Sequence, residues 1–137
     1  MNEMIPPGMA DSGVEETAQL SVAAISDGAA AAWDTFIESQ PTGSFYHLSG
    51  WRGINEAELG HTCEYLAATR PDGSIVGALP LVLVASRLFG RILCSMPFVN
   101  FGGPVASSTA VRSLLADCAA RRAESLRADY LELRCAR

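Results

Sequence analysis

The chain contains no lysine: all ten of its basic residues are arginine, against fifteen aspartates and glutamates. This absence excludes catalysis through a lysine Schiff base and the phosphate-binding lysine of a P-loop. The net charge of −5 and a pI near 4.9 argue against a nucleic-acid-binding module, which usually carries a basic stripe. Heavy use of alanine together with arginine indicates a GC-rich, bacterial genome.

Cysteine and histidine are also scarce, and their spacing does not indicate a metal site. The four cysteines form no C-x-x-C pair, and the only histidine close to one of them is His61, beside Cys63. A zinc site is therefore not expected. The cysteines lie in apolar runs (Cys63, Cys94, Cys118 and Cys135), which favours reduced thiols and a cytoplasmic location.

No signal peptide and no membrane-spanning run is present in the sequence. Residues 1–17 are acidic and hold Pro6-Pro7-Gly8, which predicts a disordered N-terminal tail. The longest apolar run, Ile75 to Ser86, is too short to cross a bilayer and contains Pro80. Because proline cannot donate to a strand ladder, Pro80 predicts a bulge or an edge position.

The remaining 120 residues, from 18 to 137, predict one α/β (α+β) domain: a mixed sheet with flanking helices in the order β-α-α-β-β-β-α-β. A hairpin in the middle and a helix between the last two strands predict antiparallel and parallel pairing respectively. Asp27 is the expected N-cap of the first helix, and Ser107 or Ser108 that of the last one. The predicted strands are 18–25, 65–69, 75–86, 91–96 and 129–135, and the predicted helices are 28–39, 49–59 and 108–126.

Four motifs in a fixed order then give a resemblance. They are FYHLSGW at 45–51, GALPL at 77–81, SMPFVNFGGP at 95–104 and YLELR at 130–134. Together they resemble the FemAB family of GNAT-like N-acyltransferases, in particular its branch associated with PEP-CTERM/exosortase exopolysaccharide loci. The resemblance covers residues 30 to 135 and implies the first of the two GNAT-like halves of such a protein, hence an incomplete fold.

The resemblance implies transfer of an aminoacyl or acyl group to an amine of a peptidoglycan or exopolysaccharide precursor. Two departures bear on this expectation. The Gln-x-x-x-W-x-x-x-K pattern of peptidoglycan-bridge enzymes is replaced by His47, Trp51 and Asn55, and the acyl-CoA loop pattern of ordinary GNAT enzymes is absent. No cofactor is therefore expected, and the acyl donor stays open.

Candidate substrate-binding residues follow from the motifs, and no catalytic residue is assigned. Gly102-Gly103 before a helix offers backbone N–H groups to an anion or a carbonyl, or only turns the chain. Trp51 lines a substrate groove or belongs to the core. His47 and His61 are general bases by type only. The complete candidate set is Tyr46, Trp51, Asn100, Phe101, Gly102, Gly103 and Arg134.

Other polar residues have a structural reading beside a functional one. Glu132 and Arg134 share one face of the last predicted strand, as a cross-strand ion pair or as a substrate-facing pair. Arg112, Arg121 and Arg122 are expected on the solvated face of the last helix.

Two functional hypotheses remain open on the sequence. The first is the N-terminal half of an acyltransferase, inactive without its second half, with a small-molecule or cell-envelope precursor as substrate. The second is a non-catalytic binding or assembly half-domain, or a gene remnant. A second half or another copy of the chain is the expected protein partner; DNA is not.

Overall fold

The computed structural model describes residues 17–88, 90–95 and 103–133. The predicted N-terminal tail lies outside the described residues except for Thr17. The elements are β1 (Ser21–Ala24), η1 (Asp27–Ala29), α2 (Ala30–Ser39), η2 (Phe45–His47), α3 (Gly50–Ala57), β2 (Thr62–Thr69), β3 (Ile75–Ser86), β4 (Gly90–Ser95), β5 (Val105–Ala106), α4 (Thr109–Ser125) and β6 (Tyr130–Glu132).

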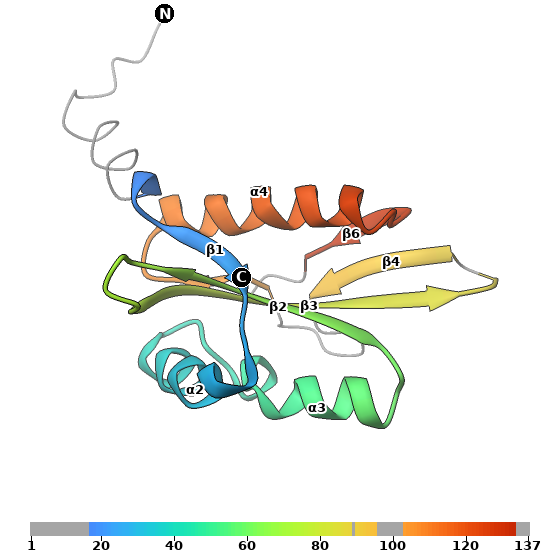
Figure 1. The fold of residues 1–137 in the computed structure, drawn as a ribbon, viewed down its shortest axis with the longest axis horizontal. Helices are drawn as coiled ribbons and strands as arrows, with labels where there is room; N and C mark the ends of the chain where they lie inside the picture. The colour runs from blue at the N-terminus through green and yellow to red at the C-terminus, as the bar shows by residue number, and fades with distance from the viewer. Residues whose placement is uncertain (1–16, 89, 96–102, 134–137) are drawn as a thin grey trace, which may run out of the picture.

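One mixed sheet separates two helical layers. Its strand order is β1-β2-β3-β4-β6, and β5 pairs with β3 as well. Helix α4 covers one face of the sheet, while α2 and α3 cover the other (Figure 1). Within the described residues, no helix is long and apolar enough to cross a membrane.

Strand β3 supplies side chains to both layers because successive residues of a strand point to opposite faces. Leu79 and Leu81 belong to the core under α4, together with Leu115. Ala78 and Val82 belong to the core under α2, together with Trp33. The near-continuous apolar run of β3 in the sequence reflects this burial on both faces.

The predicted mixed α/β sheet with its flanking helices is present. Strands β2 and β3 form the expected antiparallel hairpin, and Gly73 at its turn has the expected positive φ of 90°. Strands β4 and β6 form the expected parallel pair. Ser108 caps α4, and its Oγ accepts a hydrogen bond from the backbone N–H of Val111 at 3.3 Å.

Asp27 is not the N-cap of the first helix. Asp27 is instead the first residue of the short 3-10 segment η1, whose cap position is Ser26. Neither side chain makes a cap hydrogen bond. The Asp27 carboxylate instead lies 3.1 Å from Nη1 of Arg52 on α3. The prediction was wrong because an ion pair with the neighbouring helix replaces the local cap.

Helix α3 buries a different face from the one that its apolar residues predict. Ile54 is 43% exposed and Leu59, just beyond the helix, is 49% exposed. The buried residue is Asn55, whose side-chain amide donates to the Trp51 carbonyl oxygen at 2.8 Å. This bond satisfies the amide nitrogen within the helix itself and permits its burial.

Gly77 of β3 is the position where the sheet comes closest to α4. A Cβ atom there would lie 2.6 Å from Val111 Cγ1 and 2.9 Å from Leu115 Cδ1, both from fully buried side chains. Only glycine allows this approach without displacing the helix.

We expect Gly77→Ala to lower the free energy of unfolding by about 1–3 kcal/mol, because overpacking a dense core forces backbone or rotamer shifts. Urea denaturation followed by circular dichroism measures the change. Gly53→Ala on α3 is the control: it meets open space, so helix propensity makes it neutral or stabilising by up to ~1 kcal/mol. Equal effects of the two substitutions would contradict the packing argument.

Candidate functional site

Two strands, β4 and β5, pair with the same side of β3, and the pairing is interrupted between them. Strand β4 pairs with β3 from Ser86 down to Leu81, where Ser95 stands opposite. A continuous strand would bring position 98 opposite Ala78; Val105 of β5 stands there instead, seven residues later. The chain thus holds seven residues more between Ser95 and Val105 than a continuous strand would need. The sequence did not predict β5, which is only two residues long.

Pro80 lies on β3 opposite this interruption. The Tyr65 carbonyl accepts a hydrogen bond from the Ile25 N–H at 2.9 Å, so the backbone polar groups of Tyr65 point toward β1. Its partner Pro80 is then in a non-hydrogen-bonded pair, and its nitrogen points to the opposite side.

On that side, the pairing of β3 with β4 reaches Leu81 and its pairing with β5 reaches Ala78. No described strand residue therefore pairs with Pro80 there. Among the described residues, Pro80 thus lacks a neighbour on one side only at this point, while β3 as a whole is a central strand and not an edge strand. The register shift of this hairpin lies at Ala68/Thr69 and not at Pro80. Proline suits the position because it has no N–H to leave without a ladder partner.

The imidazole of His47 fixes the end of the interruption. Its Nε2 lies 2.8 Å from the Gly103 carbonyl oxygen, and its Nδ1 lies 3.1 Å from the Ser44 backbone nitrogen. A backbone N–H can only donate, so Nδ1 accepts and the Nε2–H donates to Gly103. The His47 carbonyl oxygen in turn accepts from Trp33 Nε1 at 2.7 Å.

These contacts make His47 a structural residue rather than a general base. The residue is 2% exposed, and burial lowers its pKa from the ordinary value of 6.5, against the raising effect of the hydrogen bond to Gly103. The neutral ring has both nitrogens engaged with the protein. A substrate proton therefore finds no available acceptor on it.

Three aromatic side chains lie close together in and after the 3-10 segment η2. Phe45 and Trp51 meet edge to face with ring centroids 5.7 Å apart, and Tyr46 and Trp51 lie 6.0 Å apart. The Trp51 indole N–H also donates to the Phe45 carbonyl oxygen at 3.2 Å. Phe45 is 67% exposed and Tyr46 is 37% exposed, so the cluster presents ring surface to solvent. We call these three residues the aromatic cluster.

The structure brings Tyr46 and Trp51, two of the candidate residues, into contact with each other and with Phe45. Phe45 stands in the quoted FYHLSGW motif, and its exposure is the feature that sequence could not supply. Gly103 is buried against His47 and offers its carbonyl oxygen to the ring. Four candidates lie outside the described residues: Asn100, Phe101, Gly102 and Arg134. The proposed pair of Arg134 with Glu132 therefore lies outside them as well.

The other chemically reactive groups are held in unreactive states. Burial raises the pKa of the Cys63 thiol to about 12, so it stays protonated at neutral pH. No disulfide joins Cys63, Cys94 and Cys118 to one another. Within the described ranges, no cluster of three or more histidine, cysteine, aspartate or glutamate side chains is arranged to hold a metal ion.

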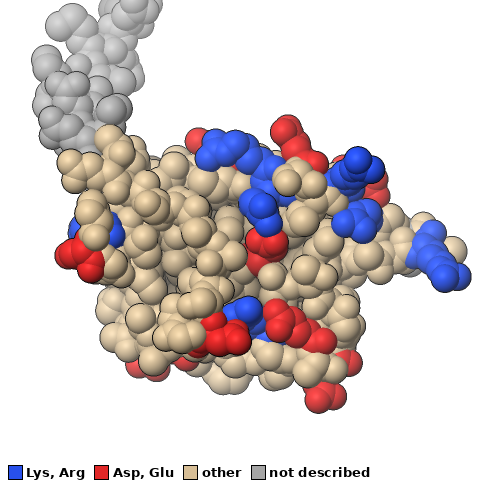
Figure 2. All heavy atoms as spheres, in the orientation of Figure 1, with Lys and Arg blue, Asp and Glu red and all other residues tan. Residues whose placement is uncertain are grey.

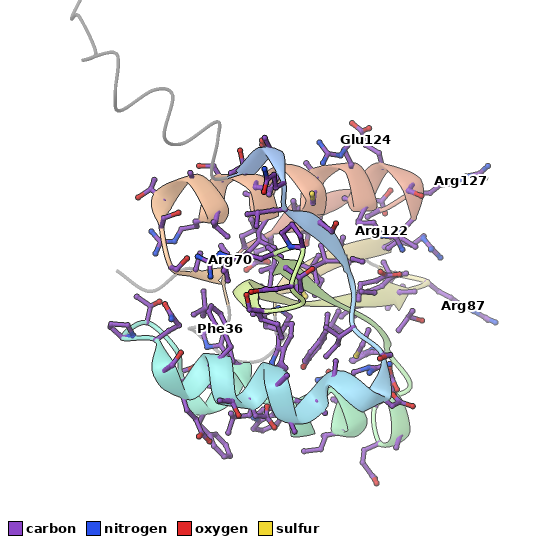
Figure 3. All side chains as sticks on the ribbon, turned by 60° about the vertical axis from the view of Figure 1, so that its left-hand side comes forward. Phe36, Arg70, Arg87, Arg122, Glu124 and Arg127 are labelled. Carbon is purple, nitrogen blue, oxygen red and sulfur yellow. The ribbon has the colours of Figure 1, made fainter. Side chains whose placement is uncertain are left out.

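Arg122 differs from its predicted place on a solvated helix face. Its Nη2 lies 2.5 Å from Oε1 of Glu64 on β2, and the Glu64 side chain is only 14% exposed. In Figure 3, Arg122 points from α4 toward the sheet, whereas Glu124 and Arg127 point away from it. The prediction failed because the sheet does not end beneath α4 and its β2 strand carries a carboxylate there.

Comparison with known proteins gives a likeness of fold alone. No family model matches the chain, and no curated protein matches it. Among solved structures, the crystal structure of a transcriptional regulator from Bacillus halodurans C-125 superposes with a TM-score of 0.60 at 15% sequence identity. The match covers 86% of this chain and 83% of that one. At this identity the comparison supports the arrangement of helices and strands and carries no activity with it.

The buried neutral His47 makes stability depend on pH. Because its folded pKa lies below the unfolded value of 6.5, the unfolded chain binds the proton more tightly. The contribution is therefore fully present above pH 6.5 and is lost as the pH falls through that value toward the lower folded pKa.

We expect the free energy of unfolding to fall between pH 7 and pH 5, and His47→Gln to flatten this slope, since Gln keeps a donor for Gly103 but does not titrate. Urea unfolding at several pH values measures both chains. An identical slope in the two proteins would show that His47 does not carry the dependence.

Proposed function

We propose that this chain is the first half of a FemAB-like N-acyltransferase, which transfers an aminoacyl or acyl group to an amine of a cell-envelope or exopolysaccharide precursor. The observation that carries the proposal is the hydrogen bond between His47 and Gly103. It joins two of the motifs that carry the resemblance, FYHLSGW and SMPFVNFGGP, just before the chain enters β5.

The chemistry requires few protein groups. The amine attacks the activated carbonyl carbon, an amide bond forms and the ester or thioester bond to the donor breaks. The departing oxygen or sulfur takes up the proton that the amine loses. Holding both reactants together supplies most of the acceleration, and backbone N–H groups stabilise the oxyanion of the tetrahedral intermediate. This route is consistent with a site in which His47 is already engaged by the protein.

The aromatic cluster is the part of this site that we assign to the acceptor. Exposed aromatic rings offer apolar faces to sugar rings and peptide side chains, and the indole and phenol add polar edges. The cluster adjoins the turn that holds Gly103, because Phe45, Tyr46 and His47 form one 3-10 segment. An acceptor bound on the rings would thus lie beside the interruption.

We expect a peptidoglycan precursor, UDP-N-acetylmuramyl-pentapeptide, to shift the amide NMR signals of residues 45–51 in a saturable way. Phe45→Ala should weaken this binding about fivefold to tenfold, the range that one aromatic contact contributes. Phe45 is a clean site for the test because its side chain is largely exposed.

Tyr130→Ala is the matched control, since Tyr130 is an exposed aromatic on β6, at the opposite end of the sheet order from β1. Equal losses in the two variants, or no shifts at residues 45–51 with this precursor, would count against an acceptor site at the cluster. Binding at the cluster with no label passing from aminoacyl-tRNA or acyl-CoA when a second half is supplied would favour the non-catalytic binding half-domain.

A further inference from the structure

A hollow of about 370 Å³ lies on the other side of the molecule, between the edge strand β1 and helix α4. Its volume falls in the range of sites that bind small organic molecules. It is separated from the aromatic cluster by the sheet, because α4 and α3 cover opposite faces (Figure 1). It has no part in the acyl transfer proposed above.

The floor of the hollow is apolar and built from small side chains. The edge strand β1 supplies Val22 and Ala24, its neighbour β2 supplies Leu66, and α4 supplies Cys118. Their pairing explains the shared face: Ala24 stands opposite Leu66, and Val22 stands opposite Ala68. Alanine at position 24 leaves uncovered space where a larger residue would fill the gap between β1 and α4.

The rim of the hollow carries an excess of positive charge. Arg121 and Arg122 both line it, with Glu64 as the one acidic lining residue. Arginine side chains gather over the region of α4 in Figure 2, with some acidic side chains among them, although the protein as a whole is acidic. One carboxylate against two guanidinium groups leaves a local surplus of one positive charge.

The two guanidinium groups retain hydrogen-bonding capacity. Glu64 takes one donor of Arg122, at Nη2, and the Arg122 side chain is 40% exposed. The Nε–H of Arg122 also has no acceptor among the described residues, but it is buried and not exposed to the hollow. Arg121 donates from Nη2 to Cys118 Sγ at 3.0 Å, and sulfur is a weak acceptor. Arginine donors in this state are suited to an oxyanion, which they bind through two parallel hydrogen bonds.

We propose that this hollow binds a small organic oxyanion, with its carboxylate or phosphate on Arg121 and Arg122 and a short apolar group on the floor formed by Val22, Ala24 and Leu66. The two halves of the site select the two halves of the ligand. An inorganic anion lacks the apolar group, and a neutral apolar molecule leaves the guanidinium donors without an acceptor.

Three probes test the proposal on the 137-residue chain by amide NMR titration: hexanoate, hexyl phosphate and neutral hexanamide. We expect hexanoate or hexyl phosphate to give saturable shifts at residues 22–24, 66 and 118–122, and hexanamide to bind at least tenfold more weakly. The tighter of the two anions identifies the head group. Equal binding of hexanamide, or unsaturable shifts spread over the whole chain, would overturn the proposal.

Substitutions test separately how the arginine charge and the apolar floor contribute to binding. Arg121→Gln should weaken the anion about tenfold, because it removes a charge-assisted pair of hydrogen bonds. Arg87→Gln makes the same change of charge at the end of the β3–β4 hairpin, away from α4 (Figure 3), and should leave the affinity unchanged. Ala24→Leu should abolish binding by filling the floor. Unchanged affinity in Arg121→Gln would refute the site even if Ala24→Leu failed to fold.

Discussion

The imidazole of His47 connects two segments that lie 56 residues apart in the chain. It receives the Ser44 N–H on one nitrogen and gives its other N–H to Gly103, and its own carbonyl accepts from the Trp33 indole. The neutral form alone can do this, because a doubly protonated ring would have a donor facing the Ser44 donor. The end of the SMPFVNFGGP stretch, the short turn 45–47 and helix α2 are therefore held together by one uncharged ring.

Strand β3 imposes the second constraint, since it is buried on both faces and bordered on both sides. A strand in this position needs a partner for each backbone group. Among the described residues, no strand residue pairs with Pro80 on the side of β4 and β5, and proline has no N–H to donate there.

Much of the architecture could be predicted from local pattern. The β2–β3 hairpin follows from Pro71-Asp72-Gly73-Ser74 between two apolar runs, and α4 from Ser108 and the four-residue spacing of Val111, Leu115 and Ala119. These features depend on residues near one another in the sequence. The face that α3 buries could not be predicted, because a polar Asn55 is buried and Ile54 is 43% exposed. The Asn55 amide nitrogen donates to the Trp51 carbonyl oxygen, while its buried Oδ1 has no partner among the described residues.

The candidate site shows the same division between local and distant contacts. The candidates Tyr46 and Trp51 were predictable as members of the FYHLSGW motif, although the contact of their rings depends on the turn between them. The role of His47 was not, because its partner Gly103 belongs to another element and nothing near position 47 indicates it. Arg122 is a similar case: helical spacing places it on a polar face, but only the fold shows Glu64 beneath it.

The β1 edge illustrates how a requirement of folding and a feature of function can be told apart. A short edge strand limits pairing with other chains, which accounts for its length of four residues. Length does not dictate the residue at position 24, where alanine lines the hollow together with Val22 and Leu66. The small floor residues of the hollow and its two arginines come from separate elements, β1 and α4, and they meet only in the folded chain. That convergence is what a binding site requires and a bare packing defect does not.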